Sequence, residues 1–430
     1  MHLRKLVTIP LVLLIVAGCA GVSTTNIKKQ PAASKATFDV STERGREDNA
    51  LVILALSGGG SRAAYLSTSV MFRLSELFDD IDLLAEVDAM SSVSGGSLPA
   101  AYYAISTDPG AATAGYGREW DEREVKALMQ HNYIARWFGN WFWPHNIVRY
   151  WFTDFDRTDI MAQTFADNLY DTEPGGRDLT IGDLRADRPY LILNATNGTS
   201  GRFGEPFTFT SESFDQLNSD INAYSLSRAV MASASFPAVF NYMTLRNHHE
   251  GISADDEFTH VFDGGNFDNL GLESVLGILS TLERRGRKYD RLVVILIDAY
   301  AESGGVSGRK SDSRKLTDFI VDTNFIDATD SLLKANRERV LKNFSSNFSN
   351  YLPNSGKAIF YHIKFADVAD TDLQRDLNRI KTDFRIDPKD AERIDQAVKT
   401  LLSPENTCLI AIRKLLIAGS NVQRDCTFSG

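Results

Sequence analysis

The sequence predicts an α/β fold in three layers, α/β/α, in which helices cover both faces of a mostly parallel central sheet. Two observations support this prediction. Short, continuous apolar runs of the length of buried strands recur along the chain, and helical patterns separate them. Strands that alternate with helices pair in parallel, and a parallel sheet needs helices on both faces.

The elements follow in order from these patterns. We expect strands over residues 51–56, 87–93, 190–195, 260–262, 292–297 and 358–363. Helices are expected over residues 62–77, 98–105 and 272–284. Near the C-terminus, Asp387 and Pro388 indicate a capped helix start, and a further helix is expected from residue 408 to about residue 418.

Composition and charge exclude several classes of protein. The chain has 430 residues, of which 43% are hydrophobic and 24% are charged, so it has enough apolar material for a large core and differs from disordered chains. Its net charge of -10 disfavours binding to the phosphate backbone of nucleic acids. We therefore expect no nucleic-acid partner.

The N-terminus has the features of an export signal. Two basic residues precede an apolar run over residues 6–17, which is too short to span a bilayer. The sequence V-A-G-C that follows, ending at Cys19, resembles the lipobox of bacterial lipoproteins. This resemblance predicts a lipoprotein signal peptide over residues 1–18 and lipidation of Cys19, with a plain secretory signal as the alternative.

The same resemblance implies a location. Ala20, rather than an acidic residue, follows the cysteine, and lipoproteins with this feature are sorted to the outer membrane. We expect a protein of the bacterial cell envelope that is lipid-anchored to the outer membrane and faces the periplasm. Residues 19–48 lack periodic apolar spacing and predict a flexible tether, and residues 49–430 form one globular domain.

Two further cysteines, Cys408 and Cys426, predict a disulfide, because an even pair in an exported protein favours a bond. The helix that begins at Cys408 rises about 17 Å, and the chain after it can return up to about 25 Å, so the geometry allows the pairing. Two free buried thiols are the alternative.

The first of three chemical motifs is a glycine-rich loop. Residues 57–64 have the sequence S-G-G-G-S-R-A-A, between a predicted strand and a predicted helix. Glycines leave backbone N–H groups uncovered, and a helix N-terminus adds a positive dipole end, so the loop is suited to hold an anion. The string also fits the dinucleotide fingerprint, but its expected acid (Asp79, Asp80 or Asp82) ends no predicted strand. We expect no cofactor.

The second and third motifs supply a nucleophile and a carboxylate. Residues 90–97, M-S-S-V-S-G-G-S, place Ser94 on a sharp strand-to-helix turn that lifts its hydroxyl out of the sheet. Ser92 stands where the usual G-x-S-x-G pattern has its first glycine. Residues 261–265, V-F-D-G-G, place Asp263 at a strand end. The three motifs together are far less expected by chance than any one of them.

In combination, these motifs resemble the patatin-like phospholipase family over roughly residues 49–300. The matching residues are Gly58, Gly59, Gly60 and Arg62 of the family's oxyanion loop, Ser94 of its nucleophile elbow and Asp263 of its D-G-[GA] motif. Residues 227–240 also resemble the family's segment before the aspartate. The form of the glycine loop is closer to the cytosolic phospholipase branch, whereas Gly271 replaces a proline found in many members.

The resemblance implies a lipid acyl ester hydrolase of the phospholipase A or lysophospholipase type, with membrane lipids as substrate. Its dyad would use Asp263 as the general base for Ser94, without histidine, through an acyl-enzyme. The oxyanion hole would be formed by Gly58, Gly59, Gly60 and Gly95. Arg62 would hold a substrate phosphate or brace the loop.

Several alternatives stay open. A triad in the α/β-hydrolase order would use Ser94, Asp298 and His362, but only one predicted strand-helix unit precedes this serine. An acyltransferase would use the same dyad and differ only in the acceptor. Two further alternatives have no catalytic activity: a lipid-binding lipoprotein and a structural protein of the cell envelope. Oligomeric state is not predicted.

Two remaining regions have structural and functional interpretations. The tryptophans all lie in one window that is either a satellite of the core or a membrane-seated lid or acyl-chain groove; they are Trp120, Trp137, Trp141, Trp143 and Trp151. The polar loop that contains His248, His249 and Glu250 fits no standard metal spacing and predicts a solvated hairpin insertion, so no metal is expected.

Overall fold

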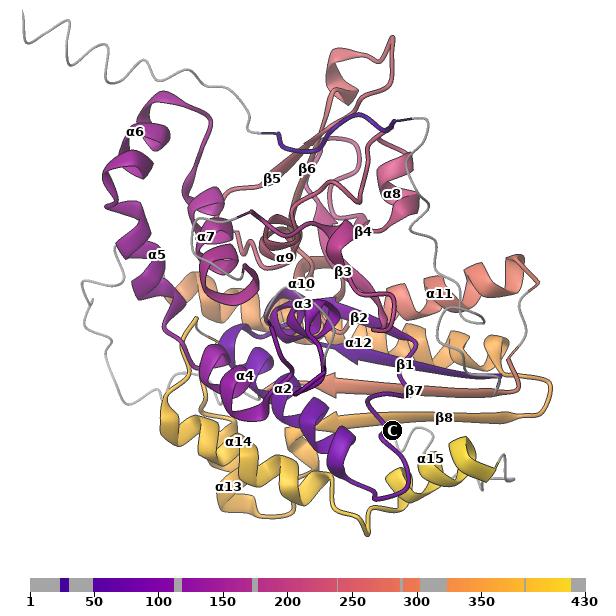
Figure 1. Cartoon of the computed structure of the whole chain (residues 1–430). Helices are drawn as coiled ribbons and strands as arrows, with labels where there is room; N and C mark the ends of the chain where they lie inside the picture. The colour runs from indigo at the N-terminus through magenta and orange to yellow at the C-terminus, as the bar shows by residue number, and fades with distance from the viewer. Residues whose placement is uncertain are drawn as a thin grey trace, which may run out of the picture.

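The computed structural model describes residues 24–30, 49–111, 118–171, 177–237, 239–286, 289–301, 323–382 and 384–418. Within these ranges, an eight-stranded sheet forms the centre of the protein (Figure 1). Its strands are β1 (Ala50–Leu56), β2 (Ala89–Val93), β3 (Tyr190–Asn197), β4 (Pro206–Phe209), β5 (Met243–Arg246), β6 (Phe258–Asp263), β7 (Arg291–Asp298) and β8 (Lys357–Lys364).

The strands have the order β5-β6-β3-β2-β1-β7-β8, and β4 pairs with β3 beside this path. Neighbours from β3 to β8 in this order are parallel, whereas β4, β5 and β6 join by antiparallel pairing. The predicted mostly parallel sheet is therefore confirmed. The short strands β4 and β5 were not predicted, because four residues give too little alternation to recognise.

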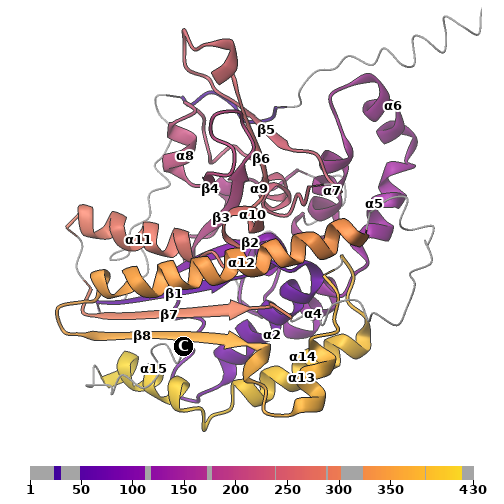
Figure 2. The ribbon, with the colours of Figure 1, turned by 180° about the vertical axis from the view of Figure 1, so that it is seen from behind.

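Helices cover both faces of the sheet. One face carries α2 (Gly60–Glu76), α3 (Ser97–Ile105), α14 (Pro388–Leu401) and α15 (Thr407–Ala418), and the other carries α11 (Leu272–Arg284) and α12 (Thr323–Phe348), as Figure 2 shows. Each face of the sheet has its own hydrophobic core, and alternate residues of β1 point into one or the other. Val52 and Leu54 pack on the first face, and Leu51 and Ile53 pack on the second. This confirms the predicted three-layer architecture.

Four helices lie between α3 and β3 in the chain: α4 (Glu122–Met129), α5 (Tyr133–Trp141), α6 (Pro144–Phe152) and α7 (Arg157–Phe165). α4 lies beside α2, whereas α5 and α6 extend to the upper left in Figure 1. The other helices are α8 (Ser211–Asp215), α9 (Leu226–Ser233), α10 (Gly265–Asp268) and α13 (Thr371–Leu377). The tryptophans of the predicted window divide: Trp120 and Trp137 are buried, whereas Trp143 and Trp151 are exposed.

The N-terminal segment 24–30 contacts the edge of the sheet. Thr24 forms a bridge with Thr244 of β5. The buried side chain of Asn26 accepts a hydrogen bond from the backbone N–H of Arg246 and donates one to its carbonyl oxygen, each at 2.8 Å. The prediction of a flexible tether over residues 19–48 is therefore wrong for these residues, because Asn26 satisfies backbone groups at a free strand edge. Cys19 and the signal peptide lie outside the described residues.

The remaining sequence-based expectations have mixed outcomes. The loop between β5 and β6 closes an antiparallel hairpin, as predicted. Cys408 on α15 is disulfide-bonded, but Cys426 lies outside the described residues, so the pairing stays a prediction. None of the helices that the structure describes has the length and hydropathy needed to cross a membrane.

Candidate active site

Ser94 sits on a strained turn between β2 and α3. Its φ of 49° lies in the left-handed region, which non-glycine residues seldom adopt. The two residues after it must be glycine, because a Cβ atom on Gly95 would lie 2.0 Å from the carbonyl oxygen of Gly60, and one on Gly96 would lie 2.6 Å from that of Ser57. The turn is thus packed directly against the glycine-rich loop.

Hydrogen-bonded serines hold this turn. The hydroxyl of Ser233, at the end of α9, accepts from the backbone N–H of Ser94 at 2.9 Å and donates to the carbonyl oxygen of Asn194 at 2.6 Å. Ser97 bridges to Ser92, with 3.1 Å between their Oγ atoms. Ser92 is fully buried and hydrogen-bonded, so a serine is accommodated where the usual pattern has glycine.

Asp263 ends β6 with its carboxylate directed at Ser94. Oδ2 accepts from the Ser94 hydroxyl at 2.9 Å, and Oδ1 accepts from the backbone N–H of Gly265 at 2.8 Å. Thr196 donates to the Asp263 carbonyl oxygen at 2.8 Å and fixes the backbone. Burial raises the pKa of Asp263 to about 6, although the hydrogen bonds from Gly265 and Ser94 lower it. The carboxyl is therefore mostly ionised at neutral pH and able to accept a proton.

The glycine-rich loop between β1 and α2 lies beside this pair. Gly59 and Gly60 have φ values of 142° and 59°, so both need glycine. They are partly exposed, as is Ser94, in surroundings that are otherwise mostly buried. Among the described residues, the backbone N–H groups of Gly59, Gly60 and Gly95 donate to no other group. Three uncovered donors thus border the serine.

One predicted oxyanion donor must be corrected. The backbone N–H of Gly58 donates to the carbonyl oxygen of Asn269 at 2.9 Å, so it is not available to a substrate oxyanion. The correction has a physical reason: the turn after Asp263 folds back onto the loop, and this long-range contact has no local sequence signal.

The contacts of Arg62 fit the second of its two predicted roles, which is to brace the glycine-rich loop. It is buried, and its Nε donates to the carbonyl oxygen of Ala299 at 2.8 Å while Nη1 donates to that of Ile380. Ser57 adds a link, because its hydroxyl accepts from the backbone N–H of Ala299 at 2.8 Å. Both residues tie the glycine-rich loop to the chain just after β7.

The alternative triad is not assembled. Asp298 is paired with His362, at 2.9 Å between Oδ2 and Nε2, and with Arg337 of α12, whose Nε donates to the same oxygen at 2.8 Å. Burial raises the pKa of Asp298, but the hydrogen bonds and charges of His362 and Arg337 outweigh it and hold the pKa well below its usual range. Ser94 directs its hydroxyl to Asp263 instead.

Sequence reasoning missed several residues that build the site. Ser233 lies in the segment 227–240, where no local pattern distinguishes it from the neighbouring serines. Asn194 donates to the Ser92 carbonyl oxygen at 2.9 Å. Asp268 accepts from three backbone N–H groups and fixes the turn between Asp263 and α11. These side chains act through contacts between distant segments, so only their position within the family motifs could have pointed to them.

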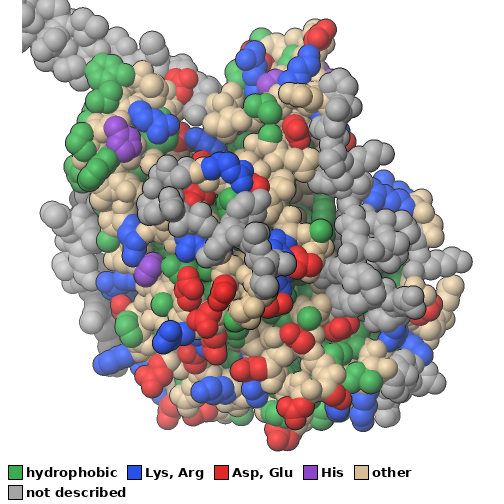
Figure 3. Space-filling view, in the orientation of Figure 1, with side chains coloured by type: hydrophobic (Ala, Val, Ile, Leu, Met, Phe, Trp, Pro, Cys, Tyr) green, Lys and Arg blue, Asp and Glu red, His purple; other side chains and the backbone are tan. Residues whose placement is uncertain are grey.

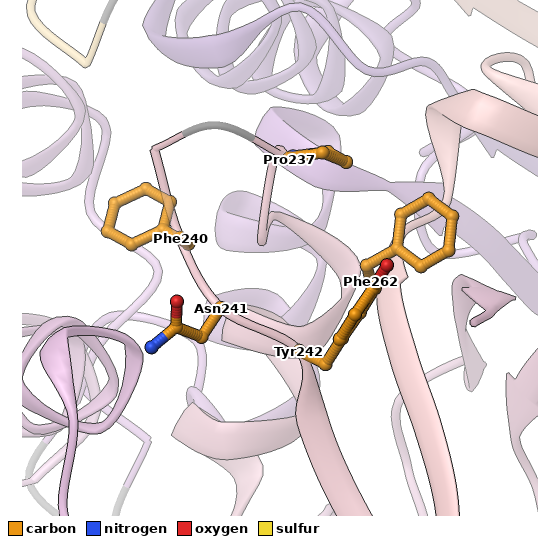
Figure 4. A pocket seen from close by; sticks show the side chains of 5 residues that line it. All are labelled: Pro237, Phe240, Asn241, Tyr242 and Phe262. Carbon is orange, nitrogen blue, oxygen red and sulfur yellow. The ribbon is translucent and has the colours of Figure 1, made fainter. Parts of the chain in front are cut away.

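A pocket of about 300 Å³ lies next to the strand that carries Asp263. It is lined by Pro237, Phe240, Asn241, Tyr242 and Phe262, the last of which directly precedes Asp263 on β6. Figure 4 shows the rings of Tyr242 and Phe262 together on one side and that of Phe240 on the other. The wall of the pocket is therefore mainly aromatic.

Comparison with known proteins gives the following findings. The human GIVD cytosolic phospholipase A2 structure aligns with a TM-score of 0.46 and 13% identity, over 86% of this chain and 61% of that chain, so the chain spans about three fifths of that protein. VipD from Legionella pneumophila aligns with a TM-score of 0.32 and 13% identity, over 91% of this chain and 72% of that chain. No curated protein matches the chain significantly. The family model described as Patatin-like phospholipase matches residues 54–276, more than half of the chain and the part that holds the glycine-rich loop, Ser94 and Asp263. The chain therefore belongs to the patatin-like phospholipase family.

Proposed function

We propose that this protein is a lipid acyl ester hydrolase of the phospholipase A or lysophospholipase type, with Ser94 as nucleophile and Asp263 as general base. Membership of a phospholipase family supports lipid ester hydrolysis. The observation that carries the finer assignment is the 2.9 Å hydrogen bond from the Ser94 hydroxyl to Asp263 Oδ2 beside uncovered glycine N–H groups.

In the first half of the reaction, Ser94 Oγ attacks the ester carbonyl carbon while Asp263 accepts the hydroxyl proton. Negative charge develops on the carbonyl oxygen, where the N–H groups of Gly59, Gly60 and Gly95 stabilise it. Collapse of the tetrahedral intermediate breaks the ester bond. The leaving alcohol takes the proton from Asp263, and the acyl group stays on Ser94.

In the second half, water attacks the acyl-enzyme and gives its proton to Asp263. The fatty acid leaves, and the proton returns to Ser94 Oγ, which restores the free enzyme. Transfer to another alcohol would use the same acyl-enzyme, so an acyltransferase differs in the acceptor alone. The strain at Ser94 and the buried base both favour an active centre over a silent lipid-binding site.

We also propose that the protein is held at a membrane of the bacterial cell envelope through lipidated Cys19. The support is the V-A-G-C sequence at the end of a short apolar run. The same anchor would bring the enzyme to its lipid substrates.

Labelling with a fluorophosphonate, which reacts with activated serines, tests the catalytic proposal. We expect the label on Ser94, no label in Ser94→Ala and strongly reduced labelling in Asp263→Asn. Product analysis with phospholipid and lysophospholipid should find free fatty acid that depends on Ser94. Transfer of the acyl group to an added alcohol without fatty acid release would instead indicate the acyltransferase. Absence of the label from the native chain would leave a non-catalytic lipid-binding protein.

A further inference from the structure

The exposed surface of α6 is unusually apolar. Trp143 is 60% exposed, Trp151 50% and Phe152 63%, and Ile147 and Val148 are exposed between them. In Figure 3, hydrophobic side chains gather at the upper left, over this helix. Among the described residues, six of the ten large exposed hydrophobic side chains lie within residues 142–152, which comprise α6 and the two residues before it.

Four of these residues share one face of the helix. Positions 147, 148, 151 and 152 follow the spacing of an apolar stripe that faces solvent, and Trp143 is the exposed residue that caps the start of the helix. The opposite side supplies the contacts to the protein: Asn146 is buried and donates to the carbonyl oxygen of Asn140, and Tyr150 packs on Trp141. The apolar residues of this helix thus face outward instead of toward the core, so the outer face is suited to an apolar partner.

The charge of the segment points to the kind of partner. Residues 125–153 contain no aspartate or glutamate, although the chain has a net charge of -10. Two cations of this segment, Arg136 and Arg149, lie on α5 and α6, whereas Lys126 lies on α4 and is paired with Glu122 and Asp395. An apolar stripe rich in tryptophan, on a helix pair (α5 and α6) whose only charged residues are Arg136 and Arg149, complements the interface of a bilayer that contains anionic lipid.

A row of aromatic rings connects this face with the pocket near Asp263. Trp151, Tyr150, Trp141, Trp137 and Phe240 follow one another with ring centroids 5.1 to 5.8 Å apart. Phe240 lines the pocket. The outer face of α6 is thus connected by packed rings to the pocket that Phe240 and Phe262 line, and Phe262 directly precedes Asp263 on β6.

The N-terminal segment lies toward the same end of the molecule. Residues 24–30 and α6 are both at the upper end in Figure 1 and Figure 2. Thr24 is five positions after the predicted lipid anchor at Cys19, a reach of at most about 18 Å. A membrane that held this anchor would therefore lie near the end of the molecule that carries α6.

From these observations we propose that the outer face of α6, here called the α6 stripe (Trp143, Ile147, Val148, Trp151 and Phe152), docks into the surface of an anionic lipid bilayer. The stripe places its tryptophan and phenylalanine rings at the headgroup level, and the nearby cations contact anionic headgroups. The proposal rests on the proposed function in one respect: docking would present lipid esters to Ser94.

Fluorescence quenching tests the docking without catalysis. The full chain carrying Ser94→Ala is mixed with vesicles of phosphatidylcholine and phosphatidylglycerol, in which the phosphatidylcholine acyl chains are brominated. We expect quenching of tryptophan emission relative to unbrominated vesicles, and loss of the quenched fraction in the added double variant W143F/W151F. Stronger quenching is expected with phosphatidylglycerol than without it. Equal quenching with and without the double substitution would overturn the proposal.

Activity provides the second arm, in the chain with Ser94 intact. W143S/W151S should lower the ratio of vesicle phospholipid hydrolysis to soluble short-chain ester hydrolysis about tenfold or more, since two large apolar side chains no longer enter the lipid. Ile417→Ser is the matched control, because Ile417 is 52% exposed on α15, at the opposite end of the molecule in Figure 1, and should leave the ratio as it is.

The outcomes separate the two proposals. If brominated lipid quenches the Ser94→Ala chain while the chain with Ser94 intact hydrolyses neither substrate, docking is supported and the proposed function is rejected. An unchanged ratio in W143S/W151S would overturn the docking proposal and leave the hydrolase intact. Conversion of a dimer to a monomer by this variant, with quenching unaffected, would show that the stripe is an interface between copies and would also overturn docking.

Discussion

The hydroxyl of Ser233 accepts a hydrogen bond from the backbone N–H of Ser94 at 2.9 Å. This contact joins the end of α9 to the turn that carries the proposed nucleophile. Because Ser94 has a φ of 49°, its turn needs such support from neighbouring elements. We therefore expect Ser233 to act as a positioning residue, since it contacts the backbone of Ser94 and not its hydroxyl.

Ser233→Ala should lower kcat roughly ten- to a hundredfold with little change in KM, because the Ser94 hydroxyl would no longer be positioned to attack the carbonyl carbon of the bound ester. The rate of fluorophosphonate labelling should fall in parallel. Ser227→Ala on the same helix is the matched control, since its buried hydroxyl contacts Ser225 and not the turn. If both variants lowered kcat equally, the positioning role would be rejected.

The pKa of Asp263 determines the pH dependence that we expect for the reaction. Its raised pKa of about 6 means that the carboxyl is protonated below that pH and cannot accept the Ser94 proton, whereas it is ionised above. We expect kcat/KM for a soluble ester to rise with pH and level off above an inflection near 6.

Asp268 serves as a control for that measurement. Its pKa is also raised to about 6 by burial, although it only fixes the backbone of the turn. Asp268→Asn should therefore retain the inflection. A profile whose inflection disappears in His362→Gln would contradict the Asp263 assignment.

The sequence predicted the sheet and the chemical motifs, because both depend on local signals. Runs of apolar residues mark β1 and β7, and strand-turn-helix sequences mark the turns at Ser94 and Asp263. The sequence did not predict contacts between distant segments. The carbonyl oxygen of Asn269 accepts the hydrogen bond of the Gly58 N–H, and Asn26 accepts that of the Arg246 N–H on the edge strand β5. Helices α4 to α9 were missed because they are short and their apolar residues face several partners.

His362 is expected to contribute to stability rather than to turnover. Its bond to Asp298 helps to hold the pKa of that carboxyl below the ordinary value of about 3.9. A lowered folded-state pKa adds stability above the ordinary pKa, and this contribution is lost as the pH falls through the folded-state value.

His362→Gln should therefore shift acid unfolding to higher pH and lower the free energy of unfolding at neutral pH by about 1 to 3 kcal/mol. Hydrolysis measured well below Tm should change little. Loss of turnover in a variant of unaltered stability would instead favour the Ser94, Asp298 and His362 triad.

Cys19 tests the membrane anchor. In Cys19→Ser the thioether cannot form, so the chain should lose its acyl modification and stay unprocessed in the bacterial host. Mass spectrometry of the N-terminal peptide measures both properties. A native mature chain that begins at a residue other than Cys19 would refute the lipobox assignment.

Asn26 tests the contact between the N-terminal segment and β5. Its amide makes 2.8 Å hydrogen bonds with both backbone groups of Arg246 and a 3.0 Å bond with Ser219. Each such bond contributes about 1 kcal/mol. Asn26→Ala should therefore release the Arg246 amide, and its hydrogen exchange should become about tenfold faster or more. Lys28→Ala is the matched control, because its ion pair with Glu250 is largely exposed and such pairs contribute little. Equal exchange rates at Arg246 in Asn26→Ala and the native chain would show that Asn26 does not hold the segment on the sheet.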